Sequence, residues 1–220
     1  MNIGANELSE IVEGEWIVQP RADWTFETVT ISRQQCQFEK GKANLFIAID
    51  EDSWHKGSGN IGIYAGWQDT HKTVHNFTEG LTGIIVQRKI KNINPSIPQL
   101  LVEDSYEAMR ALAIAVREQM TGKIIAITGT AGKSSTKNML DIVLQNKGNV
   151  VATRGNHNTR TGVPLTMACG VTDPDFMILE TAISALWMTT GGKVQSPNHT
   201  LVLLLQLEAV KRKRHLKLQN

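Results

Sequence analysis

The sequence predicts an α/β fold in which a small N-terminal α/β domain precedes a parallel-sheet domain. Two observations support this prediction. Short apolar runs alternate with stretches of helical periodicity, which is typical of strands connected by helices. A glycine-bearing turn, GTAGKSS, joins one such run to a helical stretch. With 41% apolar and 20% charged residues in 220, the composition is that of a globular protein rather than a disordered chain.

Charge and cysteine content exclude several classes of protein. The net charge of +2 depends on the basic run at 211–220, which carries no interleaved aromatic residues and therefore does not indicate nucleic-acid binding. The longest apolar runs, such as 201–205, fall far short of a membrane span. The N-terminus has no basic, apolar signal-peptide pattern, so a cytoplasmic location is expected. Two cysteines are too few for a disulfide framework.

The first domain is expected at residues 1–120. Apolar runs indicate buried strands at 45–50, 83–87 and 99–103. Glycines between these runs indicate a loop at 54–67, and a helix-compatible stretch follows at 71–79. Asp104, with Glu107 three residues later, has the capping-box spacing, so a helix is expected at 105–120.

The second domain is expected at residues 121–220. A β-branched strand at 123–128 leads into the glycine turn, and a helix follows that ends at Gly148. The apolar positions of that helix are Met139, Leu140, Ile142 and Val143. Further strands are expected at 150–153, 175–180 and 199–206. Strands that alternate with helices predict a parallel sheet covered on both faces.

The glycine turn carries the clearest chemical signal. A strand, a tight turn and a helix N-terminus together direct main-chain N–H groups at phosphate oxygens. Lys133 is expected to reach the β- and γ-phosphates, and the Ser134 hydroxyl to ligate Mg²⁺. Ser135 would add a donor to phosphate or cap the helix. The predicted nucleotide-binding residues of the loop are Gly129, Thr130, Ala131, Gly132, Lys133, Ser134 and Ser135.

Glu180 is the second candidate residue, because it ends the strand expected at 175–180. An acid at the carboxyl end of a parallel strand points toward the crevice in which open α/β sheets bind ligands. Carboxylate oxygen is a ligand that Mg²⁺ prefers. The alternative is a solvated acid at a strand end. We therefore predict that Lys133 and Glu180 are the catalytic residues, with Ser134 and Glu180 holding Mg²⁺.

Three segments resemble the Mur ligase family, and lean toward its branch that adds D-alanyl-D-alanine. AITGTAGKSSTKNML, at 126–140, closely resembles the family's ATP-binding loop. GNHNTRTGVPLTMA, at 155–168, is similar to the segment that follows the next strand, which implies that Asn158 belongs to the nucleotide site. FMILETAISALWM, at 176–188, is similar to the strand whose final acid supplies a carboxylate to Mg²⁺, which again is Glu180.

The resemblance is weaker in the first half of the chain. TISRQQCQFEKGKANLFIAID, at 30–50, is similar to the segment of the domain that holds a UDP-sugar substrate, which implies that Ser32 and Arg33 contact that substrate. The resemblance implies ATP and Mg²⁺ as cofactors, and an acyl phosphate that the amine of an amino acid or dipeptide attacks. It places the chain in cytoplasmic peptidoglycan biosynthesis, with a UDP-sugar peptide as partner.

Family members have three domains, and at about 100–200 residues per domain this chain is too short for all of them. The central domain is also expected to be incomplete, because a basic run stands at 211–220 where the family has a catalytic segment. A truncated or frameshifted chain is one interpretation, and a short chain that docks a partner is the other. A partner chain would then supply the C-terminal domain.

Two other function classes stay open at this point. One is a P-loop NTPase or kinase of another family, and the other is a non-catalytic, ATP-binding pseudoenzyme module. His71 and His75 are spaced as helical metal ligands, but no third ligand accompanies them, so a pair of solvated histidines is expected instead.

Overall fold

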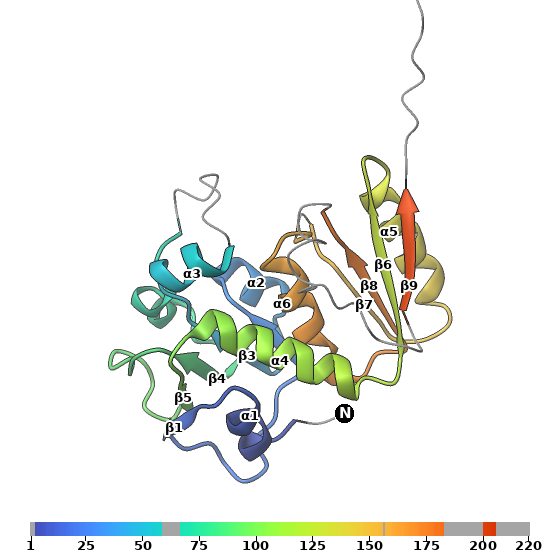
Figure 1. Ribbon diagram of the computed structural model, residues 1–220. Helices are drawn as coiled ribbons and strands as arrows, with labels where there is room; N and C mark the ends of the chain where they lie inside the picture. The colour runs from blue at the N-terminus through green and yellow to red at the C-terminus, as the bar shows by residue number, and fades with distance from the viewer. Residues whose placement is uncertain (1–2, 59–66, 156, 183–199, 206–220) are drawn as a thin grey trace, which may run out of the picture.

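The molecule is built on two β-sheets, each flanked by helices (Figure 1). The computed structural model describes residues 3–58, 67–155, 157–182 and 200–205. The first sheet belongs to the chain up to residue 120, and the second to the chain from residue 121 onward. In Figure 1 the long helix α4 (Ser105–Gln119) runs in front of the first sheet toward the second.

The first sheet has five strands in the order β1-β5-β4-β3-β2. Its four parallel strands are β2 (Thr28–Thr30), β3 (Asn44–Ile47), β4 (Leu81–Val86) and β5 (Gln99–Leu101). The edge strand β1 (Glu15–Val18) pairs with β5 in the antiparallel sense. The shorter helices of this part are α1 (Ala5–Ile11), α2 (Arg33–Phe38) and α3 (Glu51–Ser58), with 3₁₀ turns at Thr70–Lys72 and Val74–Asn76.

The second sheet is parallel, with four strands in the order β7-β8-β6-β9. The strands are β6 (Lys123–Gly129), β7 (Val150–Ala152), β8 (Phe176–Glu180) and β9 (Thr200–Leu205). Helix α5 (Lys133–Leu144) connects β6 to β7, and α6 (Gly162–Ala168), followed by a 3₁₀ turn at Cys169–Thr172, connects β7 to β8. The sheet therefore brings the carboxyl ends of β6 and β8 side by side.

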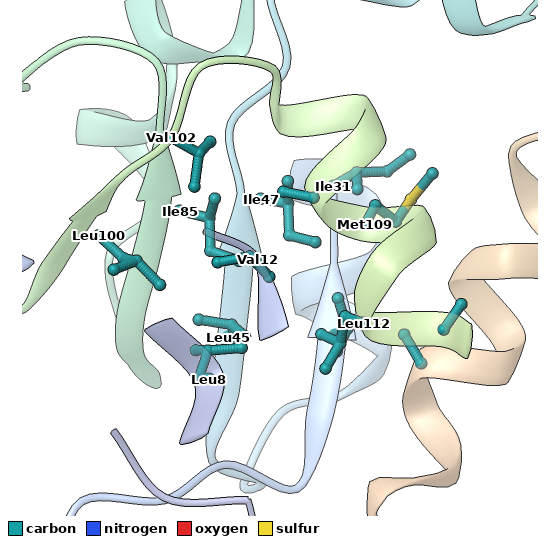
Figure 2. Close-up of a cluster of buried hydrophobic side chains, with 14 of the residues drawn as sticks. Leu8, Val12, Ile31, Leu45, Ile47, Ile85, Leu100, Val102, Met109 and Leu112 are labelled. Carbon is teal, nitrogen blue, oxygen red and sulfur yellow. The ribbon is translucent and has the colours of Figure 1, made fainter. Parts of the chain in front are cut away.

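The main core lies between the first sheet and α4. Side chains alternate across the sheet, so Leu45 and Ile47 of β3 face this core while Phe46 faces a second apolar cluster on the other side. Figure 2 shows Met109 and Leu112 of α4 close to the side chains of β3. The core continues past residue 120, because residues of α6 and the turn after it pack in the same cluster: Leu165, Ala168 and Val171.

The predicted α/β fold class is confirmed, and most predicted strands are present with ends that differ by a few residues. The helix expected at 105–120 is α4, and the Asp104 side chain accepts hydrogen bonds from the N–H groups of Tyr106 and Glu107. The Glu107 carboxylate pairs with Arg110 instead of completing a capping box. The boundary between residues 120 and 121 stays a prediction.

Two local predictions were wrong, and one helix exposes most of its apolar positions. The loop expected at 54–67 begins as helix α3, which ends at Ser58, and residues 59–66 lie outside the described residues. The stretch at 71–79 forms two short 3₁₀ turns instead of an α-helix. On α5, Met139, Ile142 and Val143 are exposed at 58–68%, because the helix turns its other side to the sheet.

His71 is buried rather than solvated. Its Nδ1 lies 2.8 Å from Oδ1 of Asp69, and its Nε2 accepts a hydrogen bond of 3.0 Å from the Gln87 N–H. Arg88 pairs with the same aspartate. Burial and the nearby Arg88 hold the pKa of His71 below its usual 6.5, against the opposing effect of Asp69. Burial raises the pKa of Asp69, but hydrogen bonds from His71 and the Arg88 charge outweigh it and lower the value overall.

This network predicts a loss of stability on acidification. A histidine whose folded pKa lies below the unfolded value of 6.5 binds fewer protons when folded, so its contribution to stability falls as the pH drops through 6.5. Thermal melts at about pH 7.5 and 5.5 should show a lower melting temperature in acid, and His71→Gln should make this difference smaller. The exposed His75, replaced in the same way, is the control. An unchanged acid difference in His71→Gln would contradict the prediction.

Among the described residues, no helix combines the length and the apolar character that crossing a membrane requires.

Candidate active site

The loop between β6 and α5 has the backbone geometry that phosphate binding requires. Gly129 has φ of 143° and Gly132 has φ of 79°, conformations that L side chains rarely adopt. Helix α5 begins directly after Gly132, and its first backbone hydrogen bond runs from the Thr136 N–H to the Gly132 carbonyl at 2.9 Å. The N–H groups before Thr136 have no partner within the helix, and they are available to an anion.

Lys133 and Ser134, the first two residues of α5, face the interior of the loop and β8. The Lys133 ammonium donates a hydrogen bond of 2.8 Å to the Gly129 carbonyl, so the side chain folds back across the loop. The Ser134 hydroxyl donates to Oε1 of Glu180 at 3.0 Å. The loop therefore presents a positive charge and a hydroxyl at one point beside the helix N-terminus.

Glu180 occupies the carboxyl end of β8, opposite Ile127 of the neighbouring strand β6. Its side chain is only 2% exposed. Oε1 accepts a second hydrogen bond, from the Asn158 side-chain amide at 3.0 Å. Oε2 is buried without a hydrogen-bond partner among the described residues, and it lies 3.5 Å from the ammonium of Lys137.

Lys137 was missed by the sequence reasoning. Its side chain is 7% exposed, which is unusual for a lysine and requires a paired charge. The available signal was the spacing, because Lys137 follows Lys133 by four residues and so lies on the same face of α5. That face is the one that contacts β8.

The residues present fit Mg²⁺ by the chemistry of their donor atoms. Ser134 Oγ and Glu180 Oε1 are oxygen atoms 3.0 Å apart, close to the roughly 2.9 Å between adjacent corners of an Mg²⁺ octahedron with ligands at about 2.0–2.1 Å. The described part of the chain has no cluster of three or more His, Cys, Asp or Glu side chains that would hold a metal without further ligands. Nucleotide phosphates and water would complete the shell.

The structure brings four of the predicted site residues together: Lys133, Ser134, Asn158 and Glu180. Gly129 and Gly132 shape the loop, and Thr130, Ala131 and Ser135 are exposed. The assignment of these residues to a nucleotide and a metal stays a prediction.

The predicted substrate residues lie elsewhere, near a cavity of about 780 Å³ between β2, α2, β7 and α6. Ser32 lines this cavity, and its hydroxyl caps α2 by accepting a hydrogen bond from the Gln35 N–H at 3.4 Å. Arg33 is exposed and is not among the described residues that line it. The cavity wall is mixed: polar side chains such as Thr30, Gln35 and Arg154 stand beside apolar ones such as Val151 and Leu165.

One short segment connects this cavity to Glu180. His157 lines the cavity, whereas the next residue, Asn158, donates to Glu180. Partial burial and the positive charges of Arg154 and Lys137 lower the pKa of His157. Arg154 also forms an ion pair with Glu39, which joins the segment to the chain beyond α2. A group bound in the cavity would thus lie next to the segment that positions the Glu180 carboxylate.

Gly162 controls the position of this segment. A Cβ atom at Gly162 would lie 2.2 Å from the His157 carbonyl oxygen, a backbone atom that cannot move aside alone. We expect Gly162→Ala to lower the free energy of unfolding by about 1–3 kcal/mol and to weaken nucleotide binding, because Asn158 must shift. Urea unfolding and calorimetry measure the two effects. Gly4→Ala, where the added Cβ meets no atom within 4 Å, is the control. Equal stability of both variants would contradict the prediction.

Comparison with known proteins points to one family. Residues 127–206 match the family model described as the Mur ligase middle domain. The UDP-N-acetylmuramoyl-tripeptide–D-alanyl-D-alanine ligase of Synechocystis sp. is 37% identical over 138 residues, which are 62% of this chain and 30% of that protein. The chain spans about a third of the length of the curated relatives it matches.

Solved MurF structures from Acinetobacter baumannii have the same fold. A crystal structure of MurF from Acinetobacter baumannii matches with a TM-score of 0.59 at 24% identity, and the match covers 83% of this chain and 36% of that one. The MurF ligase of Thermotoga maritima, solved in complex with ADP, matches with a TM-score of 0.47 at 26% identity, over 72% of this chain and 33% of that one.

Proposed function

Because the chain belongs to the Mur ligase family and is similar to its D-alanyl-D-alanine-adding ligases, we propose that it forms the nucleotide-binding part of an ATP-dependent ligase that makes an amide bond. The observation that carries this proposal is the group of side chains at the carboxyl ends of β6 and β8. Lys133, Ser134 and Glu180 converge there beside the N-terminus of α5.

Each of these groups has a role in the proposal. The first N–H groups of α5 and the Lys133 ammonium bind the phosphates, because both are donors with positive character. Ser134 Oγ and Glu180 Oε1 hold Mg²⁺, which when bound neutralises negative charge on the phosphates. Asn158 donates to Oε1 and keeps the carboxylate in place.

The reaction proposed is carboxylate activation followed by amide formation. The substrate carboxylate takes the terminal phosphoryl group of ATP to give an acyl phosphate, and an amine then displaces phosphate and releases a proton. Lys133 stabilises the charge that develops on the transferring group. By analogy with the named relatives, the carboxylate belongs to a UDP-N-acetylmuramoyl peptide and the amine to D-alanyl-D-alanine.

The cavity lined by Ser32 is the proposed place for the acyl substrate. Its wall combines apolar side chains with a few polar groups, the mixture that fixes the orientation of a small-molecule ligand, and the polar groups suit the hydrogen-bonding groups of a sugar nucleotide. His157 lines the cavity, and the adjacent Asn158 donates to Glu180. A substrate carboxylate held in the cavity could therefore approach the phosphate loop. In this proposal Ser32 contacts the substrate and Arg33 contributes from the rim.

The test combines binding with turnover. Calorimetry should detect ATP binding that is tighter with Mg²⁺ than with a chelator, and AMP, which lacks the β- and γ-phosphates, should bind far more weakly. Phosphate release should then rise when UDP-N-acetylmuramoyl-tripeptide is added.

The other outcomes each contradict part of the proposal. Absence of ATP binding would overturn the nucleotide site. Phosphate release that is the same with and without the peptide would favour an NTPase of another kind, and binding without any release would favour a non-catalytic module.

A further inference from the structure

The buried ion pair between Lys137 and Glu180 has no role in the function proposed so far. Its two side chains are 7% and 2% exposed, and the ammonium lies 3.5 Å from Oε2. Removing two charges from water is costly, and the pair persists only because each charge offsets the other. The role of Lys137 is therefore to be sought in its interaction with the Glu180 carboxylate.

The two oxygens of the Glu180 carboxylate have different surroundings. Oε1 accepts hydrogen bonds from Ser134 and Asn158, so it faces the phosphate loop. Oε2 accepts no hydrogen bond from the described residues and faces only the Lys137 ammonium. Because a carboxylate is planar and rigid, fixing Oε2 also fixes the direction of Oε1.

We propose that Lys137 is a positioning residue that holds Glu180 with Oε1 toward the loop and cancels its charge, so that a divalent cation binds only together with the nucleotide. This inference rests on the proposed function, because it concerns the same site. It assigns one oxygen of Glu180 to the cation and the other to Lys137.

The charge balance explains the dependence on nucleotide. Without a ligand, the Lys137 ammonium offsets the charge of the Glu180 carboxylate, and the Lys133 ammonium on the adjoining loop adds a further positive charge, so a bare dication meets a site with no net negative charge. The negative charges of the nucleotide phosphates would make the site net negative, so that it attracts a dication. Removal of the Lys137 charge should therefore let the carboxylate attract a bare cation.

The experiment measures Mn²⁺ binding at pH 8 without nucleotide, from the free-ion signal in electron paramagnetic resonance. Wild-type protein should bind Mn²⁺ weakly, and Lys137→Met should bind it at least about tenfold more tightly. Lys147→Met, which removes an exposed lysine just after the same helix, should behave as wild type. Lys137→Arg keeps the charge and should also bind Mn²⁺ weakly.

A double variant separates positioning from a purely structural role. The double variant Lys137→Met/Glu180→Gln should lose the gain in Mn²⁺ affinity, because the attracting carboxylate is gone. Lys137→Gln serves in place of Lys137→Met if circular dichroism shows that the methionine variant is unfolded.

An unchanged Mn²⁺ affinity in a folded Lys137 variant would overturn the inference, as would a gain that survives Glu180→Gln. Failure of wild-type protein to bind ATP would instead overturn the proposed function, so the two failures are distinguishable.

Discussion

Replacement of Lys133 by alanine is expected to weaken the binding of MgATP by about ten- to a hundredfold, since one hydrogen-bonded charge contributes about 1.5–3 kcal/mol. The lysine is the one positive side chain seen folded across the loop in the described structure, where it donates to the Gly129 carbonyl at 2.8 Å. Its loss removes a charge-assisted contact to phosphate and leaves the loop backbone unchanged. Calorimetric titration with MgATP measures the effect.

The control for this experiment is Lys147→Ala. Lys147 is exposed just beyond the end of α5, and its replacement changes the net charge by the same amount. ATP affinity in this control should stay within about threefold of wild type, because exposed charges contribute little at physiological salt. A Lys133 variant that binds ATP as tightly as the Lys147 variant would show that the loop does not hold phosphate through this side chain.

Truncation of Leu112 to alanine is expected to lower the free energy of unfolding by about 2–5 kcal/mol. Leu112 is fully buried, in the middle of α4, where the helix packs on the first sheet and on α6 (Figure 2). The lost side chain leaves a cavity that the packed side chains of the first sheet and α6 cannot fill. Urea unfolding followed by circular dichroism measures the change.

Ile114, two residues further along α4, is the matched control. It is 54% exposed, so Ile114→Ala removes similar atoms from a site that water already reaches. The expected change is within about 0.5 kcal/mol. Similar losses for both variants would contradict the prediction, because alanine has a higher helix propensity than either residue and only a difference in lost packing should separate the two.

The parts of the fold that the sequence predicted are those with a strong local signal. Helix α4 was predicted closely because its apolar residues recur at helical spacing behind the Asp104 cap. The strand, turn and helix around Gly129 were predicted for the same reason. Helix α3 was not, because Gly57 lies inside it and glycine disfavours helix, whereas in the fold a Cβ at this position would lie 2.2 Å from the Tyr106 ring.

Contacts in the site between residues that are far apart in the sequence were harder to predict than contacts within one motif. Lys133 and Ser134 share a motif, and Glu180 could be placed by the rule for strand ends. The contact between Lys137 and Glu180 depends on the tilt of α5 against β8, which no local pattern encodes. The burial of His71 was missed for a similar reason, because its hydrogen-bond partner Gln87 lies 16 residues further along the chain.

The order of strands in the second sheet has a consequence for folding during synthesis. Strand β6, which carries the phosphate loop, pairs with two strands that leave the ribosome later: Ile124 pairs with Met177 of β8 and with Thr200 of β9. Because these contacts are distant in sequence, closing them is slow. A nascent chain that has emerged only as far as α5 therefore has an unpaired apolar strand, and we expect a chaperone that recognises such strands to bind it until β8 has emerged.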